Sequence, residues 1–445
     1  MEKMRSLIEQ HNNWRGGCIN LIASENVMSP ACEKLYVSDL MHRYAEGVPF
    51  KRFYRGLTYV DQIEDLTQQE FKKHFNANFC DIRPLSGTIA NYAAFAAISQ
   101  RGDKILSLGI EHGSHVSHEK PGAAGTLGLE VGALTFNDDC TMNAEESCAK
   151  IIETKPRFIV IGGSVILFPQ PVRELRKACD QVGAKIIYDA AHVLGLITAG
   201  IFQDPLAEGA DLITTSTHKT FPGPQGGMIM GNIDEATQKK IQLAVFPQFS
   251  SNHHLHRMPA LYGALREMQE FGKDYAAQIV RNAQALGAAL YEAGFNVLAK
   301  DRGFTQSHQV LVNCGQPGAG HEAAVALEQA NIILNRLTNA NISATDKNVL
   351  RGEALFFRAF AYRILANLFG GVPIITEEIN VPRRDFVRAS RVETYTQAKN
   401  NLVEAIPLLN NIDVVKDGKI SKQMAQHLLA EIYISLGEYD NAINE

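Results

Sequence analysis

The sequence predicts an α/β fold, in which helices cover a parallel sheet, followed by an all-helical segment. From about residue 61 to 335, short apolar runs typical of buried strands alternate with helical patterns, and this alternation indicates a parallel sheet. From residue 336 onward the alternation mostly stops, and the apolar spacing is that of amphipathic helices. The 445 residues also exceed what one ordinary core needs, so we expect two or three domains.

The composition is that of a soluble globular protein, with 45% hydrophobic and 20% charged residues. A net charge of -5 leaves no basic surface of the kind that nucleic-acid binding needs. No run approaches 18 apolar residues and the first residues lack the apolar core of a secretory signal, so we expect a cytoplasmic protein without a membrane partner. The seven cysteines are odd in number and lack Cys-x-x-Cys spacing, which argues against a disulfide framework or a zinc site.

Residues 1 to about 60 are expected to be helix and loop, of which 1–44 form an N-terminal arm. The clearest strands then lie at 104–108, 157–163, 185–188 and 211–215. Between two of them, residues 171–183 have a proline near the start and a glycine at the end of a helical pattern, which are the usual helix boundaries. A long helical stretch from about 263 to 294 leads into a smaller α/β segment that ends near 335.

Three helices are predicted beyond residue 336, at 346–369, 392–410 and 421–436. The closing run, 425–443, has the Leu-Gly-x-Tyr sequence and the small-residue placement of a tetratricopeptide helix pair. The sequence therefore predicts an all-α, tetratricopeptide-like segment over 336–445.

Two predicted strand ends carry the candidate chemistry. The strand at 185–188 is followed by Asp189 and His192, and the strand at 211–215 by a Thr/Ser run and then Lys219. An amine, a carboxylate and an imidazole at the carboxyl ends of two strands are what a pyridoxal phosphate site requires. The amine forms a Schiff base, and the carboxylate keeps the pyridine nitrogen protonated. Either residue alone has a plainer explanation, a solvated lysine or a helix cap, so the pairing carries the prediction.

Two other polar motifs can each be interpreted either as a binding site or as ordinary structure. A Ser-Gly-Thr sequence at 86–88 opens a predicted helix, where backbone N–H groups and the helix dipole favour a phosphate, but the same sequence also serves as an ordinary helix start. His115 and His118 have the spacing of metal ligands, yet no carboxylate or thiol lies near them in the sequence. We therefore expect surface or pocket-rim histidines and no metal.

Six short motifs follow one another along the chain. They are Leu-Ile-Ala-Ser-Glu-Asn at 21–26, Tyr-Ala-Glu-Gly at 44–47, Ser-Gly-Thr-Ile-Ala-Asn at 86–91, His-Gly-Ser-His-Val-Ser-His at 112–118, Asp-Ala-Ala-His at 189–192 and Thr-His-Lys-Thr at 217–220. On these motifs residues 1 to about 334 resemble serine hydroxymethyltransferase. The resemblance implies a fold-type-I PLP-dependent transferase, with an aspartate-aminotransferase-like large domain at 45–262 and a truncated small domain at 263–335.

The resemblance also implies roles at the cofactor, pyridoxal 5'-phosphate. Lys219 would form the Schiff base, and Asp189 would pair with the pyridine nitrogen. The other residues implied to hold the cofactor are His192 and Ser164 near the phenolic oxygen, His112 stacked on the ring, Ser86, Gly87 and Thr88 at the phosphate, and Tyr44 from a second subunit.

The implied reaction transfers the hydroxymethyl carbon between serine and tetrahydrofolate. Glu46 would be the proton-transferring acid/base, and His218 is expected among the catalytic residues. Ser29 would contact the substrate carboxylate. Tyr54 would reach the substrate from a second subunit, as Tyr44 reaches the cofactor, so the active site implies a homodimer.

Three departures from the family pattern bear on activity. Gln225 stands where the family has an arginine in Gly-Pro-Arg-Gly-Gly, and residues 247–256 replace a glycine-rich loop that meets the neighbour's phosphate. The C-terminal strand whose arginine clamps the amino-acid carboxylate is missing, so we expect turnover to fall steeply even if the cofactor binds. The alternative enzyme is a folate-independent aldolase acting on threonine-like β-hydroxy amino acids.

Residues 336–445 resemble a different family. Arg-Gly-Glu-Ala-Leu-Phe-Phe-Arg at 351–358, Leu-Phe-Gly-Gly-Val-Pro at 368–373 and Arg-Ala-Ser-Arg-Val-Glu-Thr-Tyr at 388–395 are similar to SusD-like glycan-binding lipoproteins of bacterial outer membranes. Residues 328–336 are compatible with either family. We therefore expect a mosaic of two truncated parts, with a genuine fusion as the alternative.

The helical segment leaves a second class of function open, a binding or scaffold protein with a catalytically silent cofactor domain. Glycan binding by 336–445 is not the favoured outcome, because a severed repeat exposes an apolar face and has a marginal core.

Overall fold

The computed structural model describes residues 1–313, 318–381, 383, 385–415 and 418–445. The chain divides into two compact units, unit 1 (Met1–Asn313) and unit 2 (Cys314–Glu445). No helix in the described ranges combines the length and the apolar character that crossing a bilayer requires.

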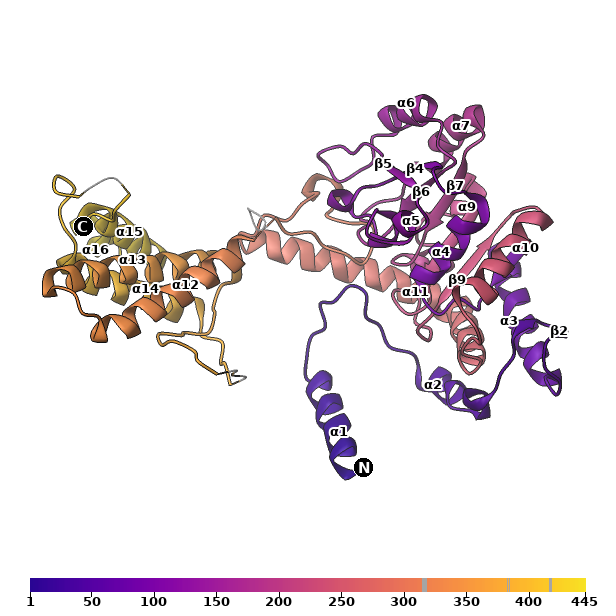
Figure 1. Ribbon diagram of the computed structural model, residues 1–445, viewed down its shortest axis with the longest axis horizontal. Helices are drawn as coiled ribbons and strands as arrows, with labels where there is room; N and C mark the ends of the chain where they lie inside the picture. The colour runs from indigo at the N-terminus through magenta and orange to yellow at the C-terminus, as the bar shows by residue number, and fades with distance from the viewer. Residues whose placement is uncertain (314–317, 382, 384, 416–417) are drawn as a thin grey trace. The chain divides into compact units, whose positions relative to one another are not determined.

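Unit 1 is built on a seven-stranded sheet with the order β3-β9-β8-β7-β6-β4-β5 (Figure 1). Its strands are β3 (Phe79–Asp81), β4 (Lys104–Ser107), β5 (Glu130–Ala133), β6 (Phe158–Gly162), β7 (Lys185–Asp189), β8 (Leu212–Ser216) and β9 (Gly227–Gly231). The five strands from β5 to β8 in this order are parallel, whereas β9 pairs antiparallel with both β8 and β3. The predicted parallel sheet is confirmed, and the four predicted strands are β4, β6, β7 and β8.

Helices cover the sheet on both faces. The helices of unit 1 after the arm are α3 (Thr58–His74), α4 (Gly87–Ile98), α5 (Ala123–Thr126), α6 (Ala144–Thr154), α7 (Val172–Val182), α8 (Leu194–Thr198), α9 (Pro205–Glu208), α10 (Glu235–Leu243) and α11 (Arg257–Glu292). Alternate side chains of a strand point to opposite faces of the sheet, so a buried strand needs a helical layer on each face. Strand β7 is an example. Ile186 and Tyr188 join the core formed with α3, α7 and α11, while Ile187 joins the core formed with α4 and α10.

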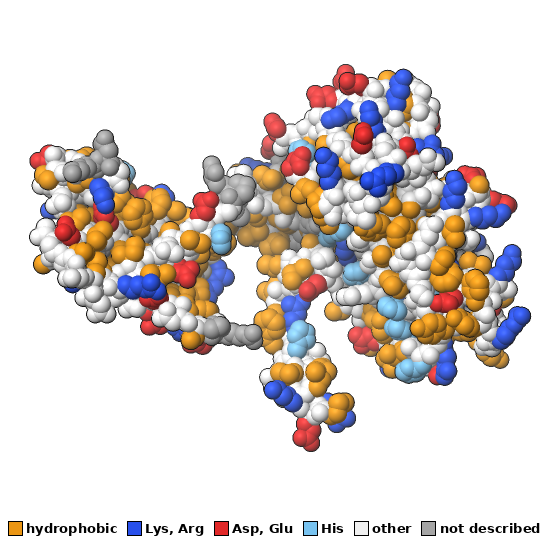
Figure 2. Space-filling model, in the orientation of Figure 1, with side chains coloured by type: hydrophobic (Ala, Val, Ile, Leu, Met, Phe, Trp, Pro, Cys, Tyr) orange, Lys and Arg blue, Asp and Glu red, His pale blue; other side chains and the backbone are white. Residues whose placement is uncertain are grey.

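The N-terminal arm lies mostly outside these cores. It contains α1 (Glu2–Gly16) and α2 (Pro30–Tyr36), followed by the short hairpin β1 (Gly47–Val48) and β2 (Lys51–Arg52). No residue of α1 is buried, and its hydrophobic side chains are visible on the surface in Figure 2. Its exposed apolar residues are Met4, Leu7, Ile8 and Trp14. An exposed apolar set of this kind marks a surface that another chain can cover.

The short turns complete the described elements. They are η1 (Asp39–His42), η2 (Ile110–His112), η3 (Val116–His118), the π-helical η4 (Ala244–Phe249), η5 (Lys300–Arg302), η6 (Leu337–Asn339) and η7 (Ile406–Leu408).

The predicted small domain at 263–335 does not form as one body. The first part of it continues α11, and beyond that helix an antiparallel bridge joins Val297 to Val312. The last part, α12 (Ala319–Arg336), belongs to unit 2. The boundary therefore lies at 313/314 instead of 335, because Ala323 and Leu327 of α12 are buried in the core of the helical unit.

Unit 2 is helical, as predicted. Its further helices are α13 (Ala344–Phe369), α14 (Arg391–Ala405), α15 (Lys422–Leu436) and α16 (Tyr439–Asn444). Three of these starts follow from local sequence: Ser343, Ser390 and Ser421 cap α13, α14 and α15 through their hydroxyls. Gly437 ends α15 with a positive φ of 75°, a conformation that glycine adopts at little cost.

Candidate active site

The sheet brings Lys219 and Asp189 to the same edge. Strands β7 and β8 are parallel neighbours with Asp189 opposite Thr214, so their carboxyl ends lie side by side. Asp189 is the last residue of β7, and Lys219 follows the end of β8 by three residues. Burial lowers the pKa of the Lys219 amine, although the nearby Asp189 charge opposes this. A lysine with a lowered pKa has a larger neutral fraction and is a better nucleophile.

Asp189 is held by a buried set of hydrogen bonds. His118 Nε2 and Asn91 Nδ2 each donate to Asp189 Oδ2 at 2.9 Å, and the backbone N–H of Ala191 donates to Oδ1 at 3.0 Å. Burial by itself raises the pKa of Asp189, but the bonds from His118 and Asn91 outweigh it and hold the pKa well below its ordinary range. The carboxylate therefore stays charged in the interior, where it can hold a proton on a basic nitrogen facing it.

His118 was predicted to be a surface or pocket-rim residue, and the structure places it in the interior. Its side chain is fully buried, and Ser114 Oγ lies 3.2 Å from its other ring nitrogen. The position could not be inferred from spacing, because 71 residues separate His118 from its partner Asp189. A weaker signal was available for Asn91, a polar residue within the otherwise apolar helix α4.

His115, and not His112, lies near the lysine and the carboxylate. Burial lowers the pKa of His115, and the charges of Asp189, His118 and Lys219 all act on it. The ring of His112 instead stacks on Phe136, with 4.6 Å between the ring centroids. His112 is exposed and His115 is partly buried, so the contacts within this chain favour His115 over His112 beside the lysine, and the role of His112 at the cofactor ring stays a prediction.

His192 meets a histidine that the sequence analysis missed. His192 Nδ1 lies 3.3 Å from His308 Nε2, and the two rings stack with 5.5 Å between centroids. Burial, aided by the Lys219 charge, lowers the pKa of His192 to about 3. Burial likewise lowers the pKa of His308 to about 4. Both imidazoles are therefore neutral near pH 7, and 116 residues of separation explain why no local pattern pairs them.

Gln309 connects this histidine pair to Ser164. Its side-chain amide donates to the Ser164 carbonyl at 2.7 Å and to His192 Nδ1 at 3.3 Å, and its oxygen accepts from the backbone N–H of Ile166 at 2.8 Å. Ser164 and His192, expected near the same oxygen of the cofactor, are thus tied to one amide.

The start of α4 forms an open cradle beside the end of β8. Ser86 caps the helix by accepting from the backbone N–H of Ile89 at 3.2 Å, which leaves the N–H groups of Gly87 and Thr88 without helical acceptors. A Cβ on Gly87 would lie 2.5 Å from Ser216 Oγ, so a larger residue here would force the Ser216 hydroxyl to move. The arrangement can bind an anion such as a phosphate.

A guanidinium lies beneath the loop that carries Gln225. Arg257 is buried and donates to the Gly227 carbonyl at 3.1 Å, to Thr217 Oγ1 at 3.2 Å, and to the carbonyls of Pro84 and Ile82. Burial lowers its pKa to about 10. The loop thus has a cation beneath it even though position 225 carries none.

Three predicted residues have other partners in this chain. Ser29 caps α2 and donates to Glu267 at 2.6 Å, so its hydroxyl helps to hold the arm against α11 instead of facing the lysine. His218 Nδ1 accepts from the Gly226 N–H at 3.4 Å within the loop, and burial lowers its pKa. Glu46 accepts from Tyr54 and from a serine hydroxyl of the 247–256 loop, at 3.0 and 2.6 Å.

The Glu46 cluster, defined as Tyr44, Glu46, Tyr54 and Ser251, is held together by hydrogen bonds and a ring contact among its own members. Tyr44 and Tyr54 pack edge to face with centroids 6.3 Å apart, and both are about half exposed. Across the described ranges no hydrogen bond joins this cluster to Lys219 or Asp189. The hydrogen bonds that hold Asp189 at the lysine edge therefore come from other residues, His118, Asn91 and Ala191.

Family models match both parts of the chain. The model described as serine hydroxymethyltransferase matches residues 1–357, and one described as starch-binding associating with outer membrane matches residues 324–434. The serine hydroxymethyltransferase of Methanosphaera stadtmanae is 50% identical over 337 residues, which are 75% of this chain and 79% of that protein. That of Pyrococcus abyssi is 49% identical over 340 residues, covering 75% and 80%.

A solved structure is also similar to this chain. It is L-threonine transaldolase from Pseudomonas fluorescens in its internal aldimine state, with a TM-score of 0.68 and 26% identity. The match covers 82% of this chain and 90% of that chain.

Proposed function

The chain belongs to the serine hydroxymethyltransferase family, and on that premise we propose that unit 1 binds pyridoxal phosphate and transfers a one-carbon unit between serine and tetrahydrofolate. The observation that carries the proposal is the pair at the strand ends: an amine whose pKa is lowered beside a buried carboxylate that stays charged. The relatives' name supplies serine and the hydroxymethyl group, the family resemblance implies tetrahydrofolate as the acceptor, and the geometry offers a place for the cofactor.

The residues at this edge fit pyridoxal phosphate. Lys219 offers a neutral amine for the aldehyde carbon, and Asp189 offers a fixed charge for the pyridine nitrogen. The start of α4 offers free N–H groups for the phosphate. When bound, the cofactor supplies an electron sink for a bond broken at the amino-acid Cα.

The chain's own residues prepare the site for that chemistry. The neutral ring of His192 can exchange a hydrogen bond with a phenolic oxygen without adding charge. His118 and Asn91 keep the Asp189 carboxylate in one orientation, so its charge does not have to reorganise during the reaction. His115, half-buried beside both charged groups, is placed to cover one side of a planar ring.

The direct test of cofactor binding is spectroscopic. The purified chain is expected to absorb at about 420 nm, as a lysine-bound pyridoxal phosphate does, and Lys219→Ala is expected to abolish the band. Lys185→Ala is the matched control, because Lys185 is half exposed and pairs with Asp211 at the far end of β7. A band that survives in Lys219→Ala, or is lost in Lys185→Ala, would contradict the assignment.

The second candidate is a folate-independent aldolase acting on threonine-like amino acids. Its support is the similarity of the fold to the threonine transaldolase and the altered loop at 247–256. The two activities separate in one pair of assays on the same preparation. Formaldehyde transfer from serine to tetrahydrofolate supports the first, and acetaldehyde release from allo-threonine without folate supports the second.

We expect weak turnover with intact cofactor binding. The family's carboxylate-clamping arginine lies in a C-terminal strand, and here the chain passes instead into the helices of unit 2. Without a bidentate clamp the substrate loses orientation at the reacting carbon. A kcat within tenfold of that of a complete relative, measured side by side, would contradict this expectation.

We propose further that two chains share each active site. Tyr44 and Tyr54 of the Glu46 cluster are about half exposed, no hydrogen bond among the described residues joins the cluster to Lys219, and α1 exposes an apolar surface. Mixing Lys219→Ala chains with Glu46→Gln chains tests this, because a shared site would regain activity in the hybrid dimer. Two inactive variants that remain inactive when mixed would argue for sites built within one chain.

The junction between the two families is proposed to be a mosaic. The two family models overlap at 324–357, where α12 and α13 lie. Amplification of genomic DNA across codons 320–350 distinguishes the cases, since a single product from one genome indicates a genuine fusion. Binding of the full chain to a glycan panel tests the remaining class of function, a binding or scaffold protein. We expect no glycan to bind.

A further inference from the structure

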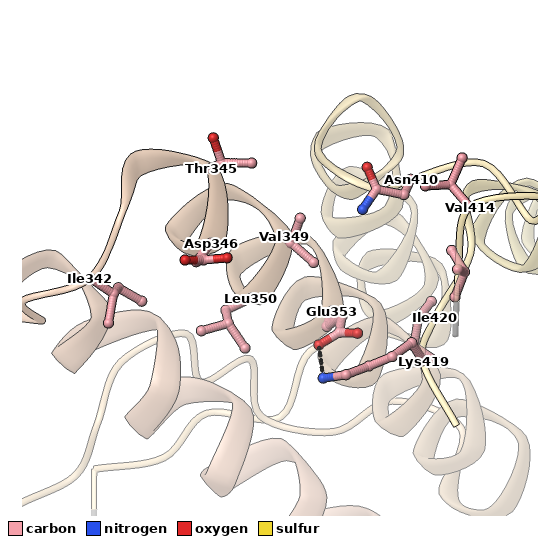
Figure 3. Close-up of a pocket in the computed structure, with 11 residues that line it drawn as sticks. Ile342, Thr345, Asp346, Val349, Leu350, Glu353, Asn410, Val414, Lys419 and Ile420 are labelled. Carbon is pink, nitrogen blue, oxygen red and sulfur yellow. Dashed lines mark hydrogen bonds and ion pairs between the residues drawn. The ribbon is translucent and has the colours of Figure 1, made fainter. Parts of the chain in front are cut away.

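Glu46 has a hydrogen-bond partner 205 residues away in the sequence. Ser251 Oγ donates to Glu46 Oε1 at 2.6 Å, and the Tyr54 hydroxyl donates to Oε2 at 3.0 Å, so both oxygens of the carboxylate are held. Another long-range pair, Glu353 with Lys419 at 3.4 Å, lies in a cavity of about 530 Å³ in unit 2 (Figure 3). The proposed reaction belongs to unit 1, so the partners of Glu46 are the ones that bear on it.

Asn252 holds the backbone that leads into Glu46. Its Oδ1 accepts from the Ala45 N–H at 2.9 Å, and its Nδ2 donates to the Arg43 carbonyl at 3.0 Å. The hairpin of β1 and β2 has two residues in each strand, so it supplies few backbone hydrogen bonds to this segment. The Asn252 side chain therefore does for residues 43–45 what a neighbouring strand would otherwise do.

Arg52 holds the carbonyls of the residues directly before and after Glu46. It donates to these carbonyls at 2.7 and 3.0 Å, and it also donates to Asp61 and Glu64 of α3, each at 2.7 Å. His253 Nε2 donates to the same Glu64 oxygen at 3.0 Å, and both of these side chains are buried. Because His253 is anchored on α3, the two residues before it are held against the Glu46 segment.

These contacts come from the loop that departs from the family pattern. Residues 247–256 stand where the family has a glycine-rich loop. Glycine has no side chain that could donate to a carboxylate or bond the backbone of a distant segment. The hydroxyl, the amide and the imidazole of residues 251–253 therefore give this chain contacts to Glu46 that a loop of glycines lacks.

On the premise of the proposed function, in which Glu46 transfers a proton, we propose that Ser251, Asn252 and His253 hold that carboxylate in its working position. Ser251 orients the carboxylate, Asn252 fixes the backbone before it, and His253 anchors the three residues on α3. They are positioning residues, because they act through Glu46.

Hydrogen exchange in the full chain tests the backbone contact without any reference to the cofactor. Asn252→Ala removes the acceptor of the Ala45 N–H, so this amide is expected to exchange at least about tenfold faster, while β6 and β7 keep their protection. Asn232→Ala is the matched control, because Asn232 bonds the backbone of residues 76 and 78 in the same way. It should leave residues 43–53 unchanged. Unaltered exchange of Ala45 in Asn252→Ala would overturn the inference.

Turnover separates positioning from a merely structural contribution. Ser251→Ala is expected to lower kcat for transfer from serine about tenfold and to change KM for serine less than about twofold, because the carboxylate alone loses a hydrogen bond. Ser251→Thr keeps the hydroxyl and should restore kcat, since the exposed side chain leaves room for a methyl group. In a Glu46→Gln background Ser251→Ala should have no further effect. The same tenfold loss in that background would show that Ser251 acts on another group, against the inference.

Failure of the inference can be distinguished from failure of the proposed function. A wild-type chain without the band at about 420 nm or without turnover contradicts the proposed function. The exchange of Ala45 then still decides whether residues 251–253 hold the Glu46 segment. A wild-type chain that shows the band and turns over, but whose Ser251→Ala variant keeps full kcat, contradicts the inference and leaves the proposed function standing.

Discussion

Replacing His308 by glutamine is expected to make unit 1 less sensitive to acid. The pKa of His308 falls from 6.5 to about 4 on folding because the ring is buried. Below pH 6.5 the unfolded chain takes up a proton that the folded chain refuses, so stability is lost as the pH falls from 6.5 toward 4. His308→Gln has no such proton to take up and avoids this loss.

The size of the effect follows from the same pKa values. Between pH 6.5 and about pH 5 the loss is at most about 2 kcal/mol, at about 1.4 kcal/mol per pH unit. The ring is only half-buried, so solvent screening reduces the expected loss to about 1 kcal/mol.

The assay has to follow unit 1 alone, because a chain with two units need not unfold in one step. Its buried thiols Cys80 and Cys179 serve this purpose, since they react with a pyridyl disulfide only after unfolding. Urea titrations of the cofactor-free chain at about pH 7.5 and about pH 5 then give the loss of unfolding free energy for each variant.

The wild type is expected to lose about 1 kcal/mol more than His308→Gln between these two pH values. His11→Gln, on the exposed helix α1, is the matched control and should lose as much as the wild type. If His308→Gln and the wild type lose the same free energy, the ring accepts its proton in the folded chain and the argument from burial fails.

Three further substitutions have expected outcomes. His118→Leu removes a hydrogen bond to the Asp189 charge and should weaken pyridoxal phosphate binding about tenfold, measured by absorbance titration, with unaltered affinity as the contrary result. Arg257→Met leaves buried carbonyls without donors and should cost unit 1 about 3 kcal/mol in urea, whereas the exposed ion pair of Arg302 predicts a loss below about 1 kcal/mol for Arg302→Met. Asn331→Ala should speed hydrogen exchange in α13 while leaving the strands of unit 1 unchanged, and an effect on unit 1 would contradict the boundary at 313/314.

The central strands were predictable because they are buried on both faces. β6 and β7 are apolar runs bounded by polar residues, a pattern that survives in the sequence without any tertiary information. Strands β3 and β9, which lie on the antiparallel side of the sheet, were not predicted from the sequence. One has three residues and the other begins and ends with glycine, so neither has the length or composition by which strands are identified.

In the candidate active site, too, some features could be predicted from the sequence and others could not. Lys219 and Asp189 follow consecutive predicted strands, and parallel strands end at a common edge, so their proximity could be inferred. The residues that bond to the carboxylate and to the nearby imidazole could not be inferred from the sequence. His118 reaches Asp189 across 71 residues and His308 reaches His192 across 116, through turns whose course depends on packing.

The sequence by itself determined the class of fold, the amine and carboxylate at the sheet edge, and the change of family near residue 336. Those features depend on local pattern and on motif order. Only the tertiary structure decided which histidine faces the lysine and to which unit α12 belongs. Asn331 of α12 donates to the Ile375 carbonyl and accepts from Arg358, and such contacts depend on distant residues that no local pattern contains.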